Sequence, residues 1–322
     1  MQADGELRYP AIRAYLANMP WAILPEKLEE IEAFLAFAFA GGRYSAAEVV
    51  QRIGAAAPRA GQSTVTPGGV AVIPLYGTIT MRAGLMSQFS GGTSTEQLGA
   101  SLRDAMSDPD VAAVVFDVDS PGGTVDGVPE LADQISAYRG QKPMVAVANT
   151  LCASAAYWLM SQCNEVVVTP SGQVGAIGVV TMHQDVSGMH QMMGVKTSLI
   201  SAGKFKTENN PYEPMTDEGR GAIQQSVDDF YGMFTAHVAR GRGVQPGDVR
   251  DGMGQGRVVN ARRAVSLGLA DRVATLGDTV SRLSSGQGRA RVKAELEEPG
   301  LTAVDIGALE TIEHEIWLMR SQ

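Results

Sequence analysis

The chain has few cysteines and no long apolar run. Its two cysteines, Cys152 and Cys163, stand in apolar surroundings, which excludes a disulfide framework or a cysteine metal site and favours a reducing compartment. The most apolar stretch, residues 31–42, contains Glu32 and is shorter than the roughly 18 residues that a membrane span needs. The first ten residues lack the basic and apolar regions of a secretory signal. We therefore expect a soluble cytoplasmic protein without a membrane anchor.

Positive charge is also scarce. Lysine and arginine together number 26 against 35 acidic residues, which gives a net charge of −9. Affinity for nucleic acid rests on lysine and arginine, so this composition predicts no nucleic-acid partner. Apolar residues make up 44% of the 322 residues, as in globular proteins, and the length allows one large core or two domains.

The composition changes along the chain and divides it into three regions. Residues 1–60 form a preface, with helical periodicity over residues 25–39 and 45–53 and a linker of Gly, Pro, Ser and Thr over residues 57–69. Residues 68–276 form the main domain. Residues 277–322 are a polar, loose tail that ends in a predicted amphipathic helix over residues 305–322.

The main domain alternates strand and helix patterns. Thr93 and Glu96 have the spacing of a capping box at the start of a helix. The alternation predicts an α/β domain with a largely parallel sheet flanked by helices. The expected strands are 69–77, 111–118, 143–148, 165–170, 175–183 and 196–203; the expected helices are 93–106, 128–139, 153–162 and 216–243, with a helix and a short strand in 261–273.

Two strand ends carry residues suited to acyl-transfer chemistry. A proline and two glycines in Asp119–Gly123 allow a tight turn whose amides approach a substrate closely. Ser154 stands at the next strand-to-helix corner. If the two strands are neighbours, the N–H groups of Gly123 and Ala155 can form an oxyanion hole beside the Ser154 hydroxyl. The alternatives are that Asp119–Gly123 is an ordinary strand-to-helix turn and that Ser154 is a buried or helix-capping serine.

A serine needs a base to take its proton. Lys204 and Lys206 follow a predicted strand and project to one side of an extended chain, and burial can lower the pKa of a lysine from about 10.4 toward neutrality. The competitor is His183 at the end of another predicted strand, with Asp185 or Asp119 as its orienting carboxylate. The residue pattern alone does not choose between these bases, and both lysines could equally be solvated.

Six motifs in a fixed order carry a resemblance to a known family: GVAVIPLYGTI, VFDVDSPGG, ASAAYW, VGAIGVV, AGKFKTENNPY and AVSLGLAD. This set resembles the serine–lysine peptidases of the signal peptide peptidase A type, over roughly residues 68–275. The resemblance implies a fold like that of Clp protease and crotonase, with Ser154 as nucleophile and Lys206 as base. It further implies oxyanion donors at Gly123 and Ala155, no metal or other cofactor, protein or peptide substrates, and a homo-oligomer that shelters the site.

One residue departs from the pattern of that family. Ala176 stands where the family usually has a serine, and the missing hydroxyl is one that would help to hold the lysine. The absence of a membrane anchor is a second departure from the signal peptide enzymes. The preface indicates one branch of that family. Its sequence WAILPEKLEEIEAFL resembles the start of phage capsid assembly proteases of the lambda C type over roughly residues 10–55. That branch implies capsid and scaffold proteins as substrates, in the host cytoplasm or inside the prohead.

Two other functions fit the same fold. One is a crotonase-like acyl-CoA enzyme, against which the pairing of Ser154 with Lys206 and the absence of a basic patch for coenzyme A both argue. The other is an inactive assembly or scaffold component, whose role would survive the substitution Ser154→Ala.

Overall fold

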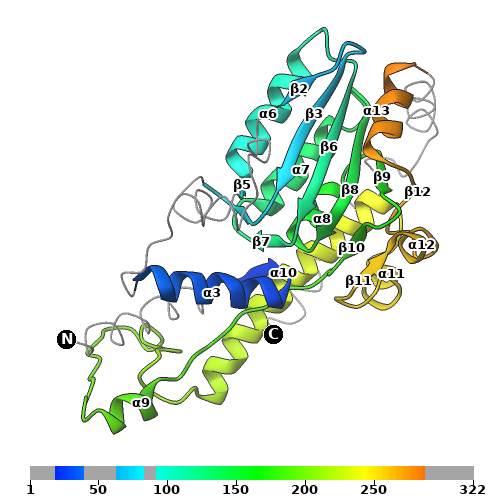
Figure 1. The fold of residues 1–322 in the computed structure, drawn as a ribbon. Coiled ribbons are helices and arrows are strands. Elements are labelled where there is room, and N and C mark those ends of the chain that lie inside the picture. The colour runs from blue at the N-terminus through cyan, green and yellow to red at the C-terminus, as the bar shows by residue number, and fades with distance from the viewer. Residues whose placement is uncertain (1–18, 40–62, 83–91, 287–322) are drawn as a thin grey trace.

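A computed structural model describes residues 19–39, 63–82 and 92–286 (Figure 1). Its centre is a sheet with the strand order β11-β10-β8-β6-β3-β2, in which β9 also pairs with β8 and β12 with β9. Only β2–β3 and β10–β11 are antiparallel among these pairings, which confirms the largely parallel sheet. The strands are β2 (Thr64–Val65), β3 (Val70–Tyr76), β6 (Ala113–Ser120), β8 (Met144–Ala153), β9 (Glu165–Val168), β10 (Gln173–Gly175), β11 (Val258–Asn260) and β12 (Arg272–Val273).

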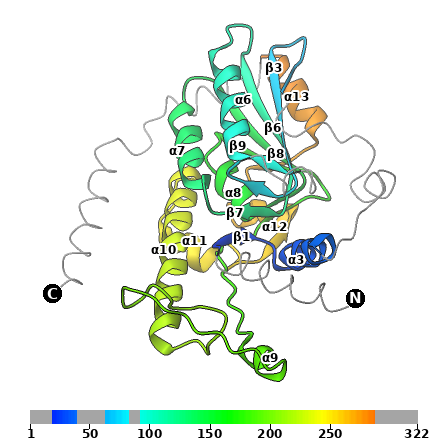
Figure 2. The ribbon, with the colours of Figure 1, turned by 90° about the vertical axis from the view of Figure 1, so that its left-hand side faces the viewer.

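Helices cover both faces of the sheet (Figures 1 and 2). Alternate side chains of β6 enter two different clusters, with Val114 and Phe116 in the larger core and Ala113 and Val115 in the cluster beneath α13. This two-sided burial explains why the strand is nearly all apolar. The helices are α6 (Thr95–Ser107), α7 (Val128–Tyr138), α8 (Ala155–Met160), α10 (Asp217–Arg242), α11 (Pro246–Gly252), α12 (Ala261–Ser266) and α13 (Leu276–Ser284).

The start of α6 differs from the predicted one. Its N-cap is Ser94, whose hydroxyl accepts from the amide of Gln97 at 3.0 Å. Thr93 lies in the short strand β5 (Thr93–Ser94), and its hydroxyl accepts from Tyr76 N at 3.0 Å and donates to Tyr76 O at 2.9 Å. The predicted capping box of Thr93 and Glu96 is therefore wrong, because Thr93 is bonded to the neighbouring strand instead.

The first described residues are built into the main domain. The helix expected over residues 25–39 is confirmed as α3 (Pro25–Phe39). The short strand before it, β1 (Trp21–Ile23), pairs antiparallel with β7 (Gly122–Thr124), which also pairs with β4 (Ile79–Thr80). The part of the preface that the structure describes is thus not separate from the core. The helices expected over residues 45–53 and 305–322 lie outside the described residues.

Residues 181–216 form an arm that leaves the sheet and returns through α10 (Figures 1 and 2). The arm contains the one-and-a-half-turn helix α9 (Ser187–Met192). The strands expected over 175–183 and 196–203 are wrong, apart from the end of β10 and an isolated bridge at Val180. A strand-like pattern forms a strand only where a sheet edge receives it, and the arm extends away from the sheet.

The core continues past the predicted boundary at residue 276. Helix α13 begins with a capping box of Thr275 and Asp278, and Leu283 is fully buried against the sheet. The loose tail therefore cannot begin before residue 285. Among the helices that the structure describes, none has both the length and the apolar character to cross a membrane.

Candidate active site

Ser154 occupies a strained corner between β8 and α8. Its backbone angles are φ 54° and ψ −120°, a conformation that costs a non-glycine residue about 1–3 kcal/mol. Its amide donates to the carbonyl of Gly175 at 2.8 Å, and its carbonyl accepts from the amide of Trp158 at 2.8 Å. The side chain makes no capping hydrogen bond to α8, so Ser154 is not a helix-capping serine. Strain of this kind is characteristic of functional positions.

The turn after β6 lies directly beside this corner. Ser120, the last residue of β6, stands opposite Cys152 in the register of β6 and β8. The Ser120 hydroxyl donates to Gly77 O at 2.6 Å and accepts from Gly122 N at 3.2 Å, which fixes the turn. A methyl group placed on Gly122 would come within 2.9 Å of the Cβ of Ser154. This role of Ser120 was not predicted, although its place just before Pro-Gly-Gly at a strand end was a usable signal.

The two predicted oxyanion donors belong to different elements, Ala155 to α8 and Gly123 to β7. Ala155 is the first residue of α8, so its N–H has no acceptor inside the helix. Gly123 lies in β7 opposite Ala22. The hydrogen bonds Leu24 N to Pro121 O (3.1 Å) and Val125 N to Pro20 O (3.2 Å) flank that pair. Because hydrogen-bonded pairs alternate in an antiparallel ladder, Gly123 N–H faces the carbonyl of Ala22.

The two candidate lysines lie on the arm. Both are exposed. Lys204 Nζ pairs with Glu218 Oε1 at 3.0 Å and lies 4.4 Å from the centre of the Phe205 ring. No hydrogen bond or ion pair among the described residues joins Lys204 or Lys206 to Ser154, whose hydroxyl lies 3.5 Å from the carbonyl of Gly178. Figure 2 shows that the arm, which contains both lysines, extends away from the sheet within one copy of the chain.

The competing histidine, His183, lies at the start of the arm. His183 lines a hollow of about 720 Å³ between the start of the arm and α10, together with Asp185 and Arg220. Asp185 accepts a hydrogen bond from Ser187 N at 2.8 Å, and the hydrogen bonds from Ser187 lower the pKa of this carboxyl. Asp185 is therefore bonded to its own loop, and the nearby His183 also lowers the pKa of this carboxyl. No hydrogen bond or ion pair among the described residues links His183 or Asp185 to Ser154.

The two carboxylates at the end of β6 have different surroundings. Asp117 is buried and accepts from the hydroxyl of Tyr76 and from Asn149 Nδ2, the latter at 3.0 Å. Burial, with Asp117 as a neighbouring charge, raises the pKa of Asp119. Asp119 belongs to β6, whereas His183 lies beyond β10, and no contact among the described residues pairs these two side chains.

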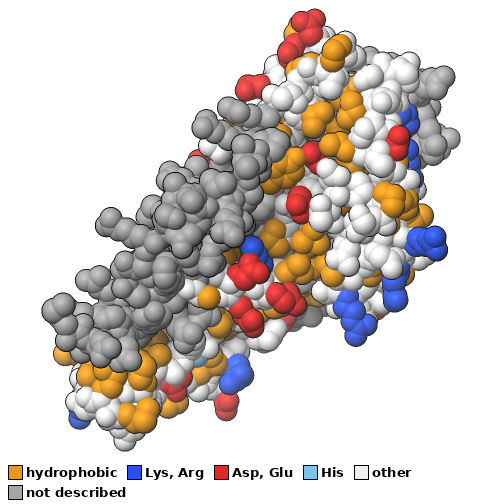
Figure 3. Space-filling view, in the orientation of Figure 1, with side chains coloured by type: hydrophobic (Ala, Val, Ile, Leu, Met, Phe, Trp, Pro, Cys, Tyr) orange, Lys and Arg blue, Asp and Glu red, His pale blue; other side chains and the backbone are white. Residues whose placement is uncertain are grey.

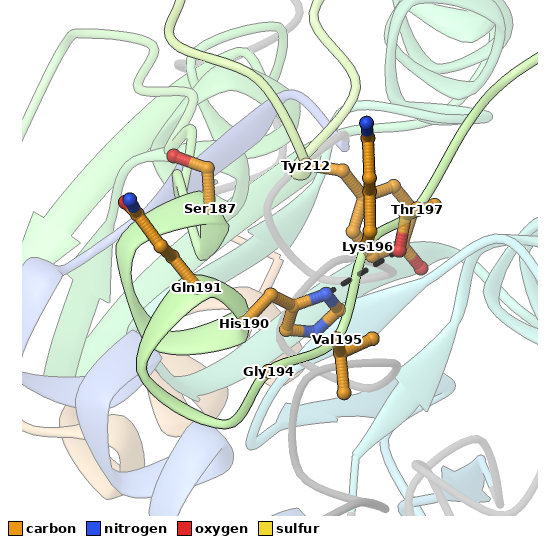
Figure 4. A pocket seen from close by; sticks show the side chains of 8 residues that line it. All are labelled: Ser187, His190, Gln191, Gly194, Val195, Lys196, Thr197 and Tyr212. Carbon is orange, nitrogen blue, oxygen red and sulfur yellow. Dashed lines mark hydrogen bonds between the residues drawn. The ribbon is translucent and has the colours of Figure 1, made fainter.

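A second, smaller hollow belongs to the arm itself (Figure 4). It has a volume of about 320 Å³ and includes His190, whose Nδ1 lies 3.5 Å from the hydroxyl of Thr197. None of the predicted site residues lines it. Across residues 19–39, 63–82 and 92–286, no three side chains of His, Cys, Asp or Glu come together as a metal site would require.

Comparison with known proteins supports the peptidase resemblance. Residues 136–289 match the model of Peptidase family S49, a range that contains Ser154 and Lys206. The head-tail preconnector protein GP5 of Enterobacteria phage P21 is 36% identical over 217 residues, and the capsid assembly protease C of Escherichia phage lambda is 32% identical over 241 residues. Protease 4 of Salmonella typhi is 29% identical over 218 residues. The predicted resemblance, including its phage branch, is confirmed.

These matches cover a larger share of this chain than of the relatives. They span 67%, 71% and 67% of this chain, but only 43%, 54% and 34% of the P21, lambda and Salmonella proteins. The chain thus spans about half the length of the phage relatives that it matches.

Proposed function

We propose that this chain is a serine endopeptidase that uses Ser154 as nucleophile and Lys206 as general base. The observation that carries the proposal is the strained Ser154 corner beside the Asp119–Gly123 turn, with Gly122 close enough to touch the serine. A crotonase-like acyl-CoA enzyme would use the same fold without a nucleophilic serine. That alternative function gives no reason for the backbone strain at Ser154.

The chemistry follows from the corner. The neutral amine of Lys206 takes the proton of the Ser154 hydroxyl while the oxygen attacks the carbonyl carbon of the substrate. The negative charge that develops on the carbonyl oxygen is stabilised by the N–H groups of Gly123 and Ala155. The protonated lysine then gives its proton to the leaving amine. Water repeats the sequence on the acyl-enzyme and frees Ser154.

The proposal needs a second copy of the chain to supply the lysine. Lys206 is exposed on the arm, and the arm exposes apolar side chains that a protein in water normally covers, such as Ile200 (99% exposed) and Met192 (84%). Figure 3 shows apolar side chains gathered at the end of the molecule that carries α9. Packing of this arm against a neighbouring copy would bury those side chains and bring Lys206 to the Ser154 of that copy. The predicted homo-oligomer is thus part of the proposed site.

The substrates that we propose are capsid or scaffold proteins of a phage. Two phage relatives carry the words capsid assembly protease and head-tail preconnector in their names, and the preface motif points to the same branch. A role as an inactive assembly component would keep the oligomer but require no catalytic serine.

The experiment that tests the proposal compares the wild-type chain with Ser154→Ala. Each is incubated with a candidate phage capsid protein, and the products are identified by mass spectrometry. We expect cleavage by the wild type and a loss of several orders of magnitude in rate for Ser154→Ala. Full activity of Ser154→Ala in a folded protein would reject the assignment.

A further inference from the structure

Strand β1 is held by backbone hydrogen bonds on both of its edges. Along one edge, Leu24 N donates to Pro121 O at 3.1 Å and Val125 N donates to Pro20 O at 3.2 Å. Along the other edge, Trp21 and Val180 exchange two hydrogen bonds, each of 2.9 Å. An extended segment that exchanges backbone hydrogen bonds with a neighbouring strand is the arrangement by which a protein accepts a peptide by strand addition. Here the segment pairs with strand β7 on one edge and with the single residue Val180 on the other.

This segment lies over the nucleophile. The point at which a methyl group on Gly122 would sit is 2.2 Å from the carbonyl oxygen of Ala22 and 2.9 Å from the Cβ of Ser154. Ala22 also stands opposite Gly123, the proposed oxyanion donor. Ser154 is only 1% exposed, so a peptide from outside has no open path to its hydroxyl. The carbonyl of Ala22 thus takes the place that a substrate carbonyl would need.

The side chains of β1 divide between two partners. Ala22 is fully buried in the main core. Trp21 and Ile23 instead form a separate apolar cluster with Leu28 and Ile31 of α3. The helix α3 therefore holds the strand through side chains that lie outside the groove. For this reason β1 and α3 can leave the groove as one unit.

We infer that residues 20–24 occupy the peptide groove of their own chain and act as an intramolecular inhibitor that must leave before a substrate binds. This inference rests on the proposed function, because it takes the groove beside Ser154 as the substrate groove. Activation can then act through α3. Any partner that binds α3 more tightly when β1 has left the groove would shift the chain toward that open state.

The test uses two substitutions at one residue in the full-length chain. Ala22→Pro removes the N–H that pairs with β7, and Ala22→Leu adds volume where the side chain has no free surface. Glu29→Ala, on the exposed side of α3, is the matched control. We expect both Ala22 variants to cleave a peptide substrate about tenfold faster than the wild type. That factor corresponds to a destabilisation of the closed state, relative to the open state, by about 1.4 kcal/mol. Glu29→Ala is expected to match the wild type.

A second measurement does not depend on catalysis. Each Ala22 variant is combined with Ser154→Ala, and hydrogen exchange of the amides of residues 122–125 and 180 is followed by mass spectrometry. We expect faster exchange there than in Ser154→Ala alone. A synthetic peptide of residues 19–26 should restore the protection, and the same peptide with proline in place of Ala22 should not.

Three results would overturn the inference. One is an Ala22 variant that folds, as judged by its melting curve, but shows neither faster cleavage nor faster exchange. Another is a failure of the peptide to restore protection. A third is cleavage of the wild type itself between Ala22 and Ile23, which would make the segment a substrate. Failure of the proposed function would show differently, as retained activity of Ser154→Ala, and the exchange experiment would still report whether β1 occupies the groove.

Discussion

Trp158 donates its indole N–H to Nδ1 of His237 at 2.8 Å, across the contact between α8 and α10. The same indole stacks on Phe234, with ring centres 4.4 Å apart and planes 8° apart. Because Nδ1 accepts this hydrogen bond, the imidazole must be neutral with its proton on Nε2, which lies 3.5 Å from Asp133. Helix α8 begins at the proposed nucleophile, so this contact secures the helix that follows Ser154.

This arrangement predicts a loss of stability in mild acid. Burial and the charge of Arg240 lower the pKa of His237, against the opposing effect of Asp133. A lowered pKa means that the unfolded chain binds the proton more readily, so the stabilisation is complete above about pH 6.5 and falls as the pH drops toward the folded pKa. We expect the free energy of unfolding to fall by at most about 1.4 kcal/mol per pH unit from this residue.

Urea unfolding at pH 7.5 and pH 5.0 measures the effect. His237→Asn keeps an acceptor for Trp158 but does not titrate, and it is expected to lose less stability than the wild type between the two pH values. Equal losses in the two proteins would contradict the prediction and place the acid-sensitive group elsewhere.

The backbone strain at Ser154 predicts different outcomes for two inactive variants. Ser154→Gly relieves the positive φ of 54°, whereas Ser154→Ala retains it. After the greater flexibility of glycine in the unfolded chain is allowed for, we expect Ser154→Gly to be about 1 kcal/mol more stable than Ser154→Ala. Urea unfolding of both variants checks this. Equal stability would mean that the corner is not strained, and substantial activity of either variant would remove Ser154 from the mechanism.

Much of the fold could be predicted because its signals are local. Strand β6 is an apolar run of the right length, and β8, the next strand of the central sheet, is separated from it by the helical pattern of α7. The Ser154 corner follows from the same reading, since it lies where β8 ends and α8 begins. The order of the motifs carried the family resemblance, which implied Ser154 as nucleophile and Lys206 as base.

The errors come from residues whose structure depends on distant parts of the chain. β1 consists of three residues, too few for a periodic pattern, and its partner β7 follows about a hundred residues later. Residues 196–203 of the arm were predicted as a strand because they include the β-branched Thr197 and Ile200 beside Leu199, but no sheet edge among the described residues receives them. Helix α13 could have been found, because Leu276, Val280 and Leu283 recur at helical spacing behind the Thr275–Asp278 capping box.

The exposed apolar side chains of the arm predict an oligomer. We expect Ile200→Asp to dissociate the assembly and to lower activity strongly, because a buried charge at an interface is costly. Val265→Asp, at an apolar residue of α12 that is 38% exposed against 99% for Ile200, is the control. Analytical ultracentrifugation at several protein concentrations measures both. A wild-type monomer with full activity would contradict the prediction.

The shared site predicts that two inactive variants restore each other. If Ser154 of one copy works with Lys206 of the next, Ser154→Ala and Lys206→Ala each destroy every site in their own assembly. Random mixing of equal amounts then places an intact serine beside an intact lysine in roughly a quarter of the sites of a closed ring. We expect the mixture to recover about that share of the wild-type rate after subunit exchange. Lys204→Ala should be mild, because Lys204 forms only an exposed ion pair with Glu218.

The control for this mixture is Ser154→Ala combined with the double variant Ser154→Ala/Lys206→Ala, which has no intact serine and should remain inactive. Recovery of activity with the first pair alone identifies Lys206 as a base supplied by a neighbouring copy, because neither subunit contains both groups. If the mixed subunits assemble normally but stay inactive, while Lys206→Ala alone is dead, the lysine must act on the serine of its own chain and the arm must fold back. If Lys206→Ala alone retains its activity, Lys206 is not the base.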